Sequence, residues 1–295
     1  MKDYSRFISE FTSGKFLVKN GALDKYLPYL IALQHGNQLE YSELPILQMG
    51  MFDSMGMPMA PTKEENDDNI AVIPIEGVLT RESSWFDYGA EEIANLICEA
   101  LETDSISAIV LKFNCSGGST DALFPFKGCL PKKNKPIIGA VDGGNYSLGV
   151  YLACVMCDKI MATDNMCQVG SIGVVANYIN WDKAYELVGG KKYEVYPPES
   201  IWKNKSTRDL KEGDDSTLIN EELTPWAQHF QDIVRKGRPN LNESIEGTLT
   251  GRTFFANYGE VNAKINGLID DVMPLDEIIQ YAFNLAKLQK AKSLF

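Results

Sequence analysis

The chain has 295 residues, of which 44% are hydrophobic and 23% are charged, so its composition is that of a globular protein. With 28 basic and 40 acidic residues its net charge is −12, which argues against nucleic acid or an anionic membrane surface as a partner, because both need clustered lysine and arginine. A run of about 18 apolar residues and the apolar region of a secretory signal are both missing, so we expect a cytoplasmic protein without an integral membrane anchor.

The N-terminal quarter of the chain differs in pattern from the rest. We expect residues 1–48 to form a helical extension, since apolar residues recur at helical spacing, at Phe7, Ile8 and Phe11 and then at Leu27, Tyr29, Leu30 and Leu33. Residues 49–69 are rich in Met, Gly and Pro and end in an acidic run, which predicts a linker. The alternative is that the methionines of this segment pack into a hydrophobic groove.

From residue 70 the pattern becomes an alternation of strands and helices. Apolar runs predict strands at 70–80, 108–113, 137–142, 159–163, 169–175 and 192–196. Helical spacing predicts helices at 88–101, 147–156, 182–187, 216–236 and 273–295, and one that follows the turn at 114–119 to about residue 129. An alternating order of this kind predicts an α/β fold with a mostly parallel sheet and right-handed crossovers.

Two glycine-rich turns follow neighbouring strands of this predicted sheet. The first is NCSGGS at 114–119 and the second is DGGNYS at 142–147, which places Ser147 at the start of a helix. Turns at the carboxyl ends of adjacent parallel strands face each other, and ligands bind at that edge of an α/β sheet. Glycine lets backbone N–H groups approach a ligand closely, and a helix N-terminus favours negative charge. Together the turns suit an acyl-transfer site with Ser147 as its nucleophile.

The same turns have two simpler interpretations. Ser147 could be an ordinary helix-capping serine, and glycine turns before helices also form phosphate-binding sites. The motifs G-x-x-x-x-G-K-[ST] and G-x-G-x-x-G are both missing from the chain, which makes nucleotide binding the weaker alternative.

A nucleophilic serine needs a general base, and here the sequence favours lysine over histidine. His35 precedes the predicted sheet, and we expect His229 to be a packed or surface residue of a helix. A lysine acts as a base when an apolar setting lowers its pKa, and Lys203 directly follows Ile201 and Trp202.

Six cysteines lie mostly in apolar segments, and two of them, Cys154 and Cys157, form a C-x-x-C pair. Free cysteine packs as a small hydrophobic residue in reduced proteins. We therefore expect neither disulfides nor a metal or redox site.

The order of the motifs resembles the signal peptide peptidase A (protease IV) family of serine peptidases. The resemblance covers residues 70–272 and rests on NCSGGS at 114–119, DGGNYSLGVY at 142–151, VGSIGVV at 169–175 and GRTFFANYGEVNAKINGLID at 251–270. It implies a crotonase-like fold shared with the Clp protease subunit, an α/β superhelix with mostly parallel sheets. It also implies that 70–272 is a peptidase core, with 273–295 as a C-terminal helix.

The resemblance assigns roles residue by residue for a Ser-Lys dyad that cleaves peptide or protein substrates without a metal or other cofactor. Ser147 matches the nucleophile and Lys203 the general base, with Lys205 as the alternative base. The backbone N–H groups of Gly117 and Leu148 match the oxyanion hole, with Gly118 beside them, and Ser171 matches a serine that orients the lysine. The family assembles into homo-oligomeric rings or domes, so the dyad is expected to be shared between subunits.

Three residues depart from the family pattern. Cys115 and Ser116 replace the common Ser-Pro, and Leu148 stands where Gly or Ala is common, so its bulk is expected to narrow the substrate cleft. None of these changes removes a reacting group.

The resemblance leaves the biological role open. The missing membrane anchor suits a soluble member, either a phage or prophage head-maturation protease or a protease of general peptide turnover. Two other functions compete with it: an inactive scaffold protein on the same fold, and a crotonase-type acyl-CoA enzyme, which would need a carboxylate base and a basic nucleotide pocket.

Overall fold

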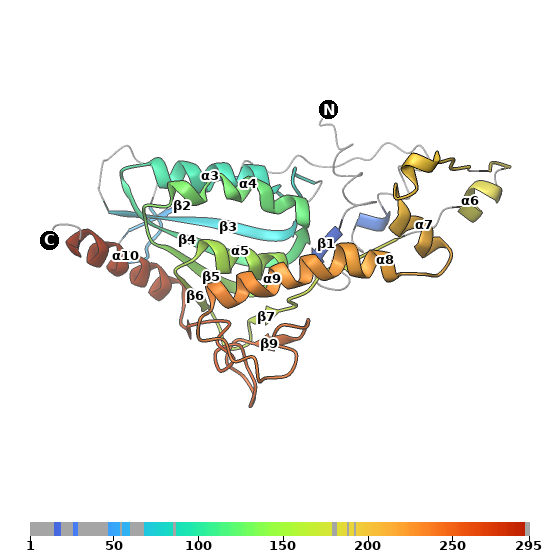
Figure 1. The fold of residues 1–295 in the computed structure, drawn as a ribbon. Helices are drawn as coiled ribbons and strands as arrows, with labels where there is room; N and C mark the ends of the chain where they lie inside the picture. Colours follow the sequence, from blue (N-terminus) through green and yellow to red (C-terminus); the bar gives the residue numbers. More distant parts are fainter. Residues whose placement is uncertain are drawn as a thin grey trace.

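The computed structural model describes residues 15–18, 26–28, 47–53, 55–59, 68–84, 87–178, 182–187, 189–191 and 193–292. They form a twisted sheet with helices on its two faces (Figure 1). The strands are β1 Lys15–Val18, β2 Gly50–Phe52, β3 Asn69–Leu79, β4 Ile106–Ser119, β5 Ile137–Tyr146, β6 Lys159–Ala162, β7 Gln168–Gly170, β8 Val175–Ala176, β9 Thr253–Phe255 and β10 Asp271–Val272.

The α-helices are α3 Ala90–Glu102, α4 Phe124–Lys127, α5 Leu148–Met156, α6 Asp182–Leu187, α7 Lys205–Lys211, α8 Ser216–Leu218, α9 Thr224–Gly237 and α10 Leu275–Lys292. A π-helical turn, Ile219–Leu223, joins α8 to α9. Short 3-10 turns lie at Thr120–Leu123, Leu130–Lys132 and Pro198–Ser200.

The centre of the sheet is parallel, as the sequence predicts. β4 lies between β3 and β5, and β5 pairs in parallel with β6 along one stretch and with β7 further on. The order across the sheet is β10-β6-β5-β4-β1-β8. The α/β class with a mostly parallel sheet is therefore confirmed.

Both faces of the sheet are covered, because successive side chains of a strand point to opposite faces. Ile73 and Ile75 of β3 pack in the main core with α3 and α5. Ile70 and Val72 of the same strand pack on the other face against α10. Apolar runs such as AIVLKF are therefore buried on both sides, as expected for a central parallel strand.

One segment extends away from the sheet. Figure 1 shows α6 and α7 at the right of the view, outside the layers formed by α3, α5 and α9. We call residues 182–211 the arm, of which 182–187, 189–191 and 193–211 are described. Several large apolar side chains of the arm are exposed, among them Leu187, Tyr193, Val195, Ile201 and Trp202.

Five expectations from the sequence need correction. Within 1–48, Lys15–Val18 is a strand, because its backbone pairs with β4 and β8; the apolar group at Phe7 to Phe11 lies outside the described residues. Within 49–69, Gly50–Phe52 is a strand on β3, and Met49 and Met51 pack against the main core, whereas Met55 and Met57 are exposed.

The other three corrections concern the segment 169–175, the glycine turns and the arm. The strand expected at 169–175 is interrupted, because β7 ends at Gly170 and β8 begins at Val175. The glycine turns at 114–119 and 142–146 are extended backbone that continues β4 and β5, because both remain paired to neighbouring strands. Residues 193–196 are irregular instead of a strand, since they lie in the arm without a neighbouring strand among the described residues.

Candidate active site

Ser147 occupies a strained position between β5 and α5. Its backbone has φ 50° and ψ −111°, a region that glycine favours and other residues seldom adopt. Backbone bonds hold it there: its N–H donates to the Gly170 carbonyl at 2.8 Å, and its carbonyl accepts from the Tyr151 N–H at 3.0 Å. Non-glycine residues with such dihedrals cluster at functional sites.

The Ser147 hydroxyl is buried in this turn. It donates to the carbonyl oxygen of Gly173 at 3.3 Å, and the residue is 1% exposed. Its side chain makes no cap hydrogen bond to its own helix. The interpretation of Ser147 as an ordinary capping serine is therefore not supported.

The two glycine segments lie against each other at the carboxyl ends of β4 and β5. Cys115 is aligned with Asn145 across the two strands. A Cβ added at Gly118 would lie 2.0 Å from the Leu79 carbonyl oxygen and 2.8 Å from Leu148 Cδ2. Because the Leu79 carbonyl oxygen is so close, only glycine fits at Gly118. The nearby Leu148 side chain shows that the start of α5 contacts this end of β4.

The backbone donors expected to form an oxyanion hole flank this contact. The Leu148 N–H belongs to the first turn of α5, whose donors have no helical acceptor. Gly117 has φ 98°, and its N–H points to Cys115 Sγ at 3.4 Å. The Leu148 side chain is fully buried in the main core beside Gly118. Its bulk therefore fills the core instead of narrowing a substrate cleft.

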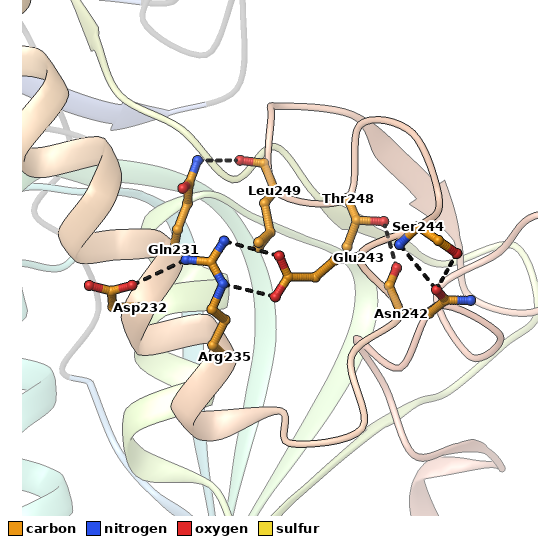
Figure 2. Close-up of polar contacts among 8 residues, drawn as sticks. All are labelled: Gln231, Asp232, Arg235, Asn242, Glu243, Ser244, Thr248 and Leu249. Atoms are coloured by element: carbon orange, nitrogen blue, oxygen red, sulfur yellow. Dashed lines mark hydrogen bonds and ion pairs between the residues drawn. The ribbon is translucent and has the colours of Figure 1, made fainter.

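The backbone of Ser171 also has a positive φ, 57°, and its N–H donates to the Arg252 carbonyl at 3.0 Å. Arg252 is the last residue of the loop 238–252, and hydrogen bonds connect this loop to α9 (Figure 2). There Arg235 forms two hydrogen bonds to the Glu243 carboxylate, and Gln231 donates to the Leu249 carbonyl at 3.1 Å. The segment that carries Ser171 is thus positioned by α9 through this loop.

The lysines expected as base lie in the arm and do not contact Ser147 in the described chain. Lys203 is exposed. The Lys205 amine forms a 2.6 Å ion pair with Asp209, which is the main reason that the pKa of the Asp209 carboxyl lies below its ordinary value. An open pocket of about 570 Å³ lies on the arm and is lined by Tyr196, Trp202 and Lys205 among others.

Asn145 is a feature of the site that the sequence did not single out. Its side chain is fully buried two residues before Ser147, and neither its oxygen nor its nitrogen has a hydrogen-bond partner among the described residues. A Cβ added at Gly149 would lie 2.0 Å from its Oδ1. An unpaired buried amide costs stability, so its presence here calls for an explanation.

The remaining candidate residues are the two histidines and the C-x-x-C cysteines. His229 is exposed, with its Nε2 3.0 Å from the Tyr151 hydroxyl and its ring against Trp226, so it is a surface histidine, one of the two settings expected; His35 lies outside the described residues. Burial raises the pKa of the Cys154 thiol to about 12 and also raises that of Cys157. No group of three or more metal-binding side chains occurs in the described ranges, and none of the helices described there is long and apolar enough to cross a membrane.

Comparisons with known proteins find a matching family and similar proteins. The model of the family described as Peptidase family S49 matches residues 130–289. Protease 4 of Haemophilus influenzae is 25% identical over 222 residues, which cover 74% of this chain and 35% of that protein. The chain spans about a third of the length of the curated relatives it matches.

Two similar solved structures come from different functional classes. An enoyl-CoA hydratase/isomerase family member has a TM-score of 0.40 and 16% identity, covering 86% of this chain and 77% of that one. A mutant of the 1510-N membrane-bound stomatin-specific protease, in complex with a substrate peptide, has a TM-score of 0.41 and 16% identity, covering 68% and 73%. At these scores the similarities do not extend to function.

Proposed function

The chain belongs to peptidase family S49, and from that premise we propose that it is a serine peptidase in which Ser147 is the nucleophile and Lys203 of a second copy is the general base. The observation that carries the proposal is the conformation of Ser147. A hydroxyl held at positive φ, at a helix start and beside the Gly117–Gly118 backbone, suits a nucleophile with backbone donors beside it.

In the proposed reaction the neutral Lys203 amine accepts the proton of the Ser147 hydroxyl while Oγ attacks the peptide carbonyl carbon. The hydroxyl turns from the Gly173 carbonyl to the lysine, and the Gly117 N–H turns from Cys115 Sγ to the developing oxyanion. The Leu148 N–H donates to the same oxygen. The protonated lysine then gives its proton to the leaving amine, and water hydrolyses the acyl-enzyme.

The lysine is assigned to a second copy because of where the arm lies. Lys203 sits beside the exposed Ile201 and Trp202, which are 58% and 63% exposed, and exposed apolar patches of this kind mark interaction surfaces. Burying the arm against another subunit would desolvate the lysine, and desolvation is what lowers a lysine pKa enough for it to act as a base. Lys205, held by Asp209, is the alternative base. Ser171 is proposed to orient the amine.

An inactive scaffold is the second candidate function. The observation that favours it is that neither Lys203 nor Lys205 contacts Ser147 within one chain. A soluble head-maturation role and a role in general peptide turnover both stay predictions, as does a cytoplasmic location.

The test is fluorophosphonate labelling of the purified, assembled protein, with peptide mapping and a casein-cleavage assay. We expect the label on Ser147, and loss of both label and cleavage in Ser147→Ala and in Lys203→Ala. Lys236→Ala on α9 is the matched control and should keep both. Labelling that survives in Lys203→Ala but not in Lys205→Ala would move the base to Lys205. No label and no cleavage in an assembled protein would favour the scaffold.

A further inference from the structure

The strand β1 lies in an unusual place for an N-terminal segment. It is inserted antiparallel between the last residues of β4 and the short strand β8. On one side Phe16, Leu17 and Val18 are aligned with Ser119, Gly118 and Gly117. On the other side Lys15 and Phe16 are aligned with Ala176 and Val175. β1 therefore supplies the backbone partners that the end of β4 and β8 would otherwise lack.

The two strands that hold β1 also carry the groups of the candidate active site. Gly117 and Gly118 are the β4 residues beside the start of α5. β8 begins two residues after Gly173, whose carbonyl accepts the Ser147 hydroxyl at 3.3 Å. A backbone strand that pairs with both β4 and β8 must therefore run past Ser147.

Peptides bind in this way to many proteins, as an added strand whose main-chain groups pair with a sheet edge. We propose that Lys15–Val18, in the strand position between β4 and β8, acts as a tethered mimic that competes with extended peptide substrates and so slows the enzyme. This inference rests on the proposed peptidase function. The register places Val18 opposite Gly117, so Val18 takes the place of the substrate residue whose carbonyl would enter the oxyanion hole.

A second contact ties the N-terminal segment to the same end of the molecule. The side chain of Tyr26 is fully buried, and its hydroxyl donates to the Asp87 carboxylate. Asp87 packs against Gly77, near the end of β3, where a Cβ would collide with its carboxylate. Tyr26 therefore keeps the segment that carries β1 close to β3 and β4.

Tethering makes a short strand an effective competitor. A segment of the same chain acts at an effective concentration on the order of 1 mM, whereas a free peptide competes only at its own concentration. The residues Phe16, Leu17 and Val18 are apolar, so the site is assigned to extended apolar segments of peptides or unfolded proteins. Releasing β1 should raise the apparent affinity for such a peptide by about tenfold or more.

The test uses the full chain with Phe16→Pro/Leu17→Pro. Neighbouring residues of a strand point their N–H groups to opposite sides, so two prolines remove a donor toward β4 and one toward β8. Phe7→Pro/Ile8→Pro makes the same change outside β1 and is the control. In a Ser147→Ala background, we expect a fluorescent peptide KFLVKNG to bind at least about tenfold tighter to the β1 variant than to the control. Equal affinities in the two proteins would overturn the proposal.

A second variant tests the same point without weakening the strand. In Phe16→Cys/Ser119→Cys a disulfide, verified by intact mass, would lock β1 onto β4. We expect the oxidised form to bind the peptide at least about tenfold more weakly than the reduced form; unchanged affinity would overturn the proposal.

Casein cleavage separates this inference from the proposed function. With Ser147 intact, the β1 variant should cleave about tenfold faster than the control. Cleavage that is present but equal in the two proteins overturns the inference and leaves the peptidase. Affinities that differ as expected, with no cleavage in any assembled variant, overturn the peptidase and leave a peptide-binding site that β1 occupies.

Discussion

The hydroxyl of Ser147 donates a hydrogen bond across 3.3 Å to the carbonyl oxygen of Gly173, a residue that lies between β7 and β8. This contact joins the start of α5 to the segment that leads into β8. The backbone of Ser147, with a positive φ of 50°, is also held by the hydrogen bond from its N–H to the Gly170 carbonyl. The proposed nucleophile is thus held in place at a cost in backbone strain.

The first prediction concerns that strain. Ser147→Ala keeps it, whereas Ser147→Gly relieves it, because glycine adopts φ 50° and ψ −111° without a steric penalty. We expect Ser147→Gly to be more stable than Ser147→Ala by about 1 kcal/mol in urea unfolding, with peptidase activity lost in both. The control position is Ser216, the first residue of α8. There the alanine variant should be more stable than the glycine variant, since alanine is the better helix former. A glycine variant no more stable than the alanine variant at Ser147 would show that the turn is unstrained.

The second prediction concerns the sharing of the dyad. Ser147→Ala and Lys203→Ala should each lower kcat/KM by at least about 10³-fold when assembled alone. Mixed before assembly, they should recover about a quarter of the wild-type activity, because random neighbours across a head-to-tail interface pair an intact serine with an intact lysine in that fraction of sites. Two separately assembled samples, mixed afterwards, are the control. No recovery after co-assembly would place the base in the same chain.

The parts of the molecule that could be predicted from sequence are those with local signals. The apolar runs of β3, β4 and β5 are buried on both faces and need no knowledge of distant partners. Ser147 was found because a strand end, two glycines and a helix start are adjacent in the chain. The meeting of the two glycine segments followed from the parallel order of the strands.

The parts that were missed depend on partners far along the chain. Lys15–Val18 is a short apolar run that fits a helix or a strand equally well, and only its pairing with Gly117–Ser119 makes it a strand. Met51 was assigned to a linker because its packing partners are not adjacent in sequence. The position of Lys203 relative to Ser147 could not be read from spacing, because the arm lies outside the sheet.

The third prediction concerns Gly118. A Cβ at this position would lie 2.0 Å from the Leu79 carbonyl oxygen, a backbone atom that cannot move away without disturbing β3. We expect Gly118→Ala to lower the free energy of unfolding by about 3 kcal/mol or more. Gly128→Ala is the control, because its nearest neighbour would be at an ordinary 3.4 Å. Equal melting temperatures for the two variants would show that the contact between β3 and β4 yields easily.

The fourth prediction uses Asp270, which joins the late part of the chain to the sheet. Burial alone would raise the pKa of its carboxyl, but hydrogen bonds from Arg238 at 2.7 Å and from the Ile160 N–H at 2.8 Å outweigh this and hold it below the ordinary value. A carboxyl whose pKa is lower in the folded state stabilises the protein above about pH 4. This stabilisation is lost as the pH falls through the folded-state pKa. Asp270→Asn should therefore lower the free energy of unfolding by about 2 kcal/mol at pH 7, and by less at pH 3. Glu243→Gln, at an exposed ion pair, should change little at either pH. A deficit in Asp270→Asn that is the same at both pH values would mean that packing, not the charge of Asp270, holds this junction.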